Sequence, residues 1–154
     1  MSFLVIGGYW LQHHRLFRML GRGNGWLLLL NLLFLLTISF LPFPTAVMAD
    51  RLVSGHQVNL AVAFYGVGLL LPAITVSVLL NYIDAAALLA PSAQNRATHR
   101  LARLSWLSVV LFTITIGVAL IAPLIALLYY FLSPIYWAIN GARASHELED
   151  NLAA

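Results

Sequence analysis

Histidines and acidic residues, five of each, are the side chains that could carry out acid–base or metal chemistry in this sequence. His13 and His14 are adjacent, and neighbouring residues of a helix point about 100° apart, so these two rings cannot converge on one ion. The remaining histidines are widely separated, and neither HxxxH nor HExxH spacing occurs. The sequence therefore predicts no metal site.

Catalytic motifs are also lacking in the sequence. It contains no cysteine, nucleophile elbow, phosphate loop or paired-carboxylate motif, and every acidic residue lies outside the apolar segments. We therefore expect neither enzymatic activity nor a cofactor. A proton-coupled transporter usually carries an acidic residue within the membrane, and a potassium filter of backbone carbonyls needs a TVGYG-type loop. Neither feature is encoded here.

Polar residues within apolar segments are the remaining candidates, because such groups are costly in hydrocarbon unless they are paired. The spacing of Trp10, His14 and Arg18 places an aromatic ring, a titratable ring and a cation on one helix face. Such a histidine can serve as a pH-sensitive link or as an interfacial residue. Asn31 interrupts a run of leucines.

Small and polar residues recur in the next apolar segment at steps of three, four or seven. The stripe consists of Asn59, Ala63, Gly66, Ala73, Ser77 and Asn81. Membrane helices approach one another closely along such faces. Helix packing is the simpler interpretation, and the lining of an ion path is the alternative.

The composition of the chain indicates what kind of structural elements hold these residues in place. The chain of 154 residues is 62% hydrophobic and 8% charged, with a mean hydropathy of +0.91, whereas soluble domains carry about 25% charged residues. A soluble globule is excluded, and about 20 residues per span leave no room for a separate soluble domain. The net charge of +3 comes from arginines alone. In a membrane protein this charge indicates topology rather than nucleic-acid binding.

We expect an all-α polytopic transmembrane bundle of four full spans plus an N-terminal half-span, forming one domain over residues 1–142. The apolar part of the first segment, residues 2–11, would rise only about 15 Å, half of a membrane. Helix breaks or kinks are expected at Pro42, Pro44, Pro72 and Pro123. The expected helices cover about residues 2–20, 25–41, 57–82, 104–120 and 123–140, followed by a short tail over 143–154.

Arginine positions predict the orientation. With alternating helices, seven of the eight arginines fall on one side, which the positive-inside rule makes cytoplasmic. The 83–103 loop and the tail would then be cytoplasmic, and the 49–56 loop would face outside. A secretory signal peptide cleaved after residues 46–49 is the rival interpretation. The long, proline-terminated apolar run and the further apolar segments argue against it.

Two motifs point to a family. Trp10, His13 and His14 belong to a Trp-x-x-His-His-x-x-Phe pattern, and an Asn31-containing leucine helix then ends in Pro-Phe-Pro-Thr at residues 42–45. This combination resembles the prokaryotic transmembrane protein 175 family, which contains potassium channels of bacteria, endosomes and lysosomes. The resemblance covers nearly the whole chain, more loosely after residue 57.

The resemblance implies a homo-tetramer in the lipid bilayer with the potassium ion as permeant. The family's first helix carries a Phe-Ser-Asp motif and lines the pore, and this chain looks as if it starts inside the second helix. We therefore expect the reading frame to continue upstream of Met1. By resemblance, Trp10, His13, His14 and Asn31 are candidate polar braces of that first helix, and no pore-filter residue is assigned.

Three functions are compatible with the sequence. The leading hypothesis is a truncated or partial potassium-permeable channel subunit in a bacterial plasma membrane, conducting passively in an oligomer. The alternatives are a non-conducting membrane assembly module and, with less support, a small secondary transporter.

Overall fold

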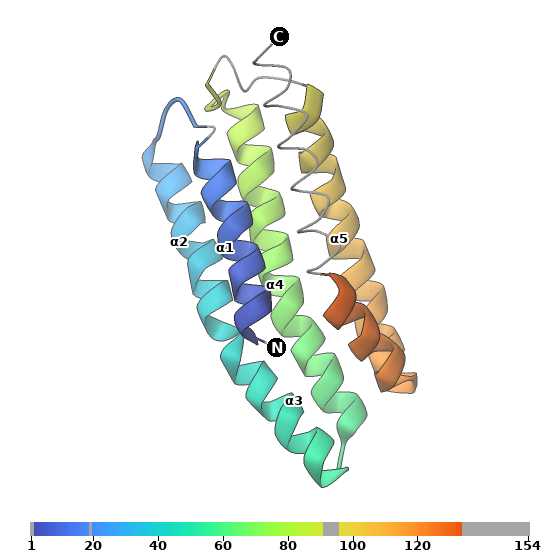
Figure 1. Cartoon of the computed structure of the whole chain (residues 1–154). Helices are drawn as coiled ribbons and strands as arrows, with labels where there is room; N and C mark the ends of the chain where they lie inside the picture. Colours follow the sequence, from blue (N-terminus) through green and yellow to red (C-terminus); the bar gives the residue numbers. More distant parts are fainter. Residues whose placement is uncertain (1, 19, 91–95, 134–154) are drawn as a thin grey trace.

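The computed structural model describes residues 2–18, 20–90 and 96–133. In that part of the chain the backbone is helical apart from short turns and one isolated backbone bridge, which confirms the predicted all-α bundle. Figure 1 shows the arrangement of the helices. They are α1 (Ser2–Arg18), α2 (Gly25–Phe40), α3 (Pro42–Ser54), α4 (Val58–Ala85) and α5 (Arg96–Ile121), followed by a shorter apolar helix, Pro123–Ser133.

The centre of the bundle is α4, which packs against α2, α3 and α5. Thirteen of its 28 residues are buried, against four of the 16 in α2. The outer face of α2 is correspondingly rich in exposed leucines, such as Leu28, Leu32 and Leu36. A face of this composition is compatible with lipid or with an apolar partner, but not with water over a large area.

The junction at Pro42 differs from the sequence-based expectation. We expected residues 42–56 to form a connection, but residues 42–54 form α3, which continues the line of α2 (Figure 1). Pro42 occupies the first turn of α3, where its missing N–H is not needed. Leu41 keeps helical angles (φ −54°, ψ −36°), and its carbonyl accepts a hydrogen bond from the Thr45 amide at 3.2 Å. The two helices therefore form a helical stretch of 30 residues, Gly25–Ser54.

Three helical stretches within the described residues are long and apolar enough to cross a membrane: Gly25–Ser54, Val58–Ala85 and Leu104–Ile121. The α4 helix is continuous through Pro72. At the predicted hairpin, α5 ends at Ile121 and the next helix begins at Pro123. The predicted helix 123–140 is described as far as Ser133, and the rest of it, with the tail over 143–154, lies outside the described residues.

The first helix, α1, has 17 residues and would rise about 25 Å, a little less than a hydrocarbon core of about 30 Å. Its buried side chains Val5 and Leu16 belong to two different apolar clusters, one central and one at the far end of α4. Figure 1 shows α1 lying alongside α2 and α4. This position brings the polar residues of α1 next to the Asn31 segment of α2.

Candidate functional site

A polar contact joins α1 to α2. The Nε2 atom of His13 lies 2.6 Å from Oδ1 of Asn31, within the partly buried contact between the two helices. Because an amide oxygen can only accept, this arrangement requires the His13 Nε2 to carry a proton. The contact gives both polar groups a partner in a region where water is scarce, so it specifies how α1 and α2 align.

Aromatic rings fix the orientation of the His13 imidazole. It stacks on Phe17, with ring centroids 4.3 Å apart, and on Phe34, with centroids 5.8 Å apart. Phe34 is fully buried, and Tyr9 meets it edge-on at 6.0 Å. Stacked imidazoles lose rotational freedom, so the hydrogen bond to Asn31 is made by a ring that is already oriented.

The other two candidate brace residues lie elsewhere. Trp10 stacks on His14 with centroids 5.4 Å apart and nearly parallel rings, and the Trp10 side chain is 59% exposed. Arg18 is also exposed. The structure thus pairs two of the four predicted residues, His13 and Asn31, in the partly buried contact between α1 and α2. It places Trp10 and His14 together on the outer face of α1.

The predicted stripe on α4 is buried over its central part. Ala63, Gly66, Ala73 and Ser77 are buried, whereas the terminal residues Asn59 and Asn81 are exposed. Its three polar side chains all donate to backbone carbonyls at 2.7 Å: Asn59 to Leu120, Ser77 to Ala73, and Asn81 to Ser77. Polar groups satisfied in this way fit helix packing better than the lining of an ion path.

Close helix contacts occur at two glycines of α4 that point to different sides of the helix. The Tyr130 ring packs on Gly66, where a methyl group would overlap the Tyr130 hydroxyl and also meet Ile116. At Gly68, a methyl group would lie 2.7 Å from Cγ of Pro44 in α3. The predicted stripe contains Gly66 but neither Gly68 nor the partner residues, because spacing along one helix does not reveal what faces it.

A buried hydroxyl accompanies the Gly66 contact. Tyr130 is fully buried between Tyr65, at 5.7 Å between ring centroids, and Phe112, at 6.2 Å. Its hydroxyl has no hydrogen-bond partner among the described residues. Within the described part of the chain, the Tyr130 side chain is held by packing against its neighbours.

A polar link also joins α2 to α4. The Thr37 hydroxyl donates to the Phe34 carbonyl at 2.7 Å and lies 3.2 Å from the Thr75 hydroxyl of α4. Together with the central position of α4, this arrangement makes α1, α2 and α4 one packed unit around Phe34, Ile38 and Val76. The fold and these intramembrane polar contacts define an integral membrane protein of the polytopic helical class.

Comparison with known proteins identifies the family. Residues 1–42, which include both His13 and Asn31, match the family described as endosomal/lysosomal potassium channel TMEM175. A potassium channel of Chryseobacterium sp. (strain P1-3) is 30% identical over 154 residues, covering 97% of this chain and 75% of the relative. No solved structure matches the chain.

Two further relatives are also potassium channels. One, from Streptomyces collinus, is 28% identical over 91% of this chain and 68% of its own length. The other, from Chamaesiphon minutus, is 36% identical over 42% of this chain and 31% of its own length. The chain belongs to the TMEM175 potassium channel family, which confirms the resemblance seen in the sequence.

Proposed function

We propose that this subunit of the TMEM175 potassium channel family conducts potassium ions passively as part of a homo-oligomer, with the His13–Asn31 contact holding α1 in the alignment that conduction needs. The hydrogen bond of 2.6 Å between α1 and α2 is the observation that supports this role. It lies within residues 1–42, the part that matches the family. A tetramer, as the resemblance implies, is the expected assembly.

The physical basis of the proposed role is geometric. A hydrogen bond between helices in a membrane contributes about 1 kcal/mol, which is small for stability but sufficient to choose between two helix alignments. The stacking of His13 on Phe17 and Phe34 restricts the bond to one direction. Loss of either partner should therefore change the population of the conducting alignment more than the fold.

Flux into proteoliposomes tests the proposal. The chain should carry potassium faster than sodium, and His13→Phe should lower potassium flux about fivefold, the equivalent of about 1 kcal/mol. His14→Phe is the matched control, because His14 is exposed on the next position of the same helix and should leave flux unchanged. Potassium flux no higher than in empty vesicles would contradict autonomous channel activity.

The proposed topology places the 83–103 loop and the tail in the cytoplasm of a bacterium, with the turn after α3 outside. It is supported by the arginine distribution. The chain lacks cysteine, so single cysteines can report their own side of the membrane. A membrane-impermeant maleimide applied to spheroplasts should label Ser54→Cys but not Ala86→Cys. The reverse pattern would overturn the orientation.

A non-conducting assembly module is the second candidate. The exposed leucines of α2 and the satisfied polar groups of α4 favour it, because both suit helix association without an aqueous path. Crosslinking in mild detergent would then reveal an oligomer in a protein without flux. A strictly monomeric species would argue against this candidate.

A further inference from the structure

The end of α4 is closed by a hydrogen-bonded turn of the Schellman type. The Leu88 amide donates to the Ile83 carbonyl at 3.1 Å, and the Ala87 amide donates to the Asp84 carbonyl at 3.2 Å. Ile83 and Leu88 are both buried in the same apolar cluster, as is usual in this motif. The turn thus ends α4 with the carbonyls of Tyr82, Ile83 and Asp84 hydrogen-bonded and with Leu88 buried.

Ala87 occupies the position of this turn that normally belongs to glycine. Its φ angle is +50°, in the left-handed region, where a β-carbon crowds the following carbonyl. The conformation is therefore strained, and it persists because the surrounding contacts enforce it. Strained backbone positions of this kind cluster at switch regions and ligand clamps.

The same turn holds the connection between α1 and α2. The Leu88 carbonyl accepts the amide of Gly21 at 2.9 Å and that of Arg22 at 3.3 Å, and Leu20 pairs with Leu89 in an isolated antiparallel bridge. Gly21 lies so close to Ala90 that an added methyl group would be 3.0 Å from its α-carbon. Both backbone segments are therefore fitted to each other.

Asn24 adds a side-chain link at this end of the bundle. Its oxygen caps α2 by accepting the Leu27 amide at 2.9 Å, while its Nδ2 donates to the Tyr82 hydroxyl of α4 at 2.8 Å. The start of α2 is thus tied to the last turns of α4. Elsewhere, α1 and α2 meet α4 through apolar side chains and through the Thr37–Thr75 hydroxyl contact.

We propose that residues 20–24 and 82–89 form a clasp that opens and closes as one unit and sets the position of the α1–α2 pair against α4 during conduction. The second part of this proposal, the role of the clasp in conduction, rests on the proposed channel function. The main support for it is the strained turn at Ala87, in which the Leu88 carbonyl accepts hydrogen bonds from the Gly21 and Arg22 amides of the α1–α2 connection.

Amide hydrogen exchange tests the opening without reference to conduction. If the clasp opens as one unit, the amides of Gly21, Arg22 and Leu88 share one degree of protection. Ala87→Gly relieves the strain and should raise the protection of all three about fivefold. Ala85→Gly is the control, since the same substitution inside α4 should lower it. Independent exchange of the three amides, or indifference to Ala87→Gly, would overturn the proposal.

A reversible lock tests the link to conduction. Paired bridge residues lie within the distance that a disulfide spans, so Leu20→Cys with Leu89→Cys should crosslink on oxidation. Oxidation should lower potassium flux at least fivefold and reduction should restore it, while neither single variant responds. Equal flux in the locked and reduced states would refute a moving clasp. If the unmodified protein lacks flux, the channel function fails, and the exchange experiment still decides whether the clasp opens.

Discussion

Two helix contacts in this bundle are built on opposite principles. Between α1 and α2, His13 and Asn31 form a hydrogen bond of 2.6 Å surrounded by aromatic rings. Between α4 and the Pro123–Ser133 helix, Tyr130 packs on Gly66, and its hydroxyl has no partner among the described residues. The first contact specifies direction at little gain in stability, whereas the second gains stability from close packing and tolerates an unsatisfied hydroxyl.

The largest effect is expected from breaking the packed contact. Gly66→Ala places a methyl group against the Tyr130 hydroxyl and Ile116, so it should lower the free energy of unfolding by about 2 kcal/mol. Unfolding in mixed detergent micelles, followed by circular dichroism, measures the change. Gly117→Ala is the matched control, because open space surrounds Gly117 and the substitution should stabilise the helix slightly. Equal stability of the two variants would contradict the close approach.

Breaking the polar contact should have a smaller effect. Asn31→Leu leaves the His13 nitrogen without its partner and should lower the free energy of unfolding by about 1.5 kcal/mol. Adding His13→Phe removes the second polar group and keeps the ring stack, so the double variant should recover most of that loss. Additive losses in the same unfolding measurement would show that the two residues do not interact.

Removing the Tyr130 hydroxyl, which has no partner among the described residues, should have the opposite sign. Tyr130→Phe keeps the ring between Tyr65 and Phe112 but deletes a buried polar atom, so it should raise the free energy of unfolding by about 1 kcal/mol. It should also reduce the penalty of Gly66→Ala, because the hydroxyl is part of the overlap. Tyr82→Phe, which loses the bond to Asn24, serves as the control and should not stabilise. A loss of stability in Tyr130→Phe would indicate a hydrogen bond to this hydroxyl.

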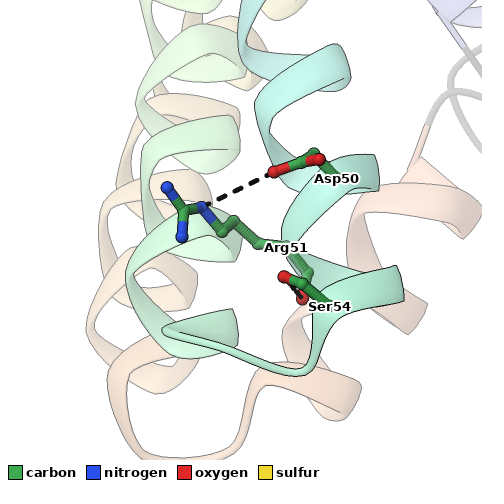
Figure 2. Close-up of polar contacts among 3 residues, drawn as sticks. All are labelled: Asp50, Arg51 and Ser54. Atoms are coloured by element: carbon green, nitrogen blue, oxygen red, sulfur yellow. Dashed lines mark hydrogen bonds and ion pairs between the residues drawn. The ribbon is translucent and has the colours of Figure 1, made fainter.

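The smallest effect is expected at a surface ion pair. Figure 2 shows Arg51 beside Asp50 near the end of α3. The Arg51 Nε lies 3.8 Å from Oδ2 of Asp50. Both side chains are exposed, at 44% and 77%, so solvent screens the attraction. Arg51→Gln should change the free energy of unfolding by less than about 0.5 kcal/mol, and 1 M salt should abolish the difference. A change comparable to that of Asn31→Leu would show that the pair is not screened.

The sequence predicted the class of fold and the family because both depend on strong local signals. Long apolar segments define helices, and the motifs around His13 and Asn31 are short and specific. The α3 helix was not predicted, because two closely spaced prolines, Pro42 and Pro44, usually mark the end of a helix. Here Pro42 lies in the first turn of a new helix, since Leu41 keeps helical backbone angles, and the sequence spacing does not reveal those angles.

The candidate site was predicted in part. The resemblance named His13 and Asn31, and the structure places them in contact, while their role as a brace stays a prediction. Trp10 and His14 were named with them but lie on the exposed side, because His14 points about 100° away from the adjacent His13 and Trp10 stacks on His14. The partners of Gly66 and Gly68 could not be predicted, because they come from segments distant in the sequence. The strained backbone at Ala87 could not be predicted either, because it depends on the conformation of the folded turn.

The continuation of α2 into α3 has a consequence for the surrounding lipid. The stretch Gly25–Ser54 rises about 45 Å, and its segment before the Asp50–Arg51 pair is longer than a hydrocarbon core of about 30 Å. Such a helix must tilt, bend at its proline junction or thicken the bilayer around it. The thickness of the host membrane therefore acts on the α2–α3 junction, and acyl-chain length becomes a variable that shifts the balance between helix tilts in this protein.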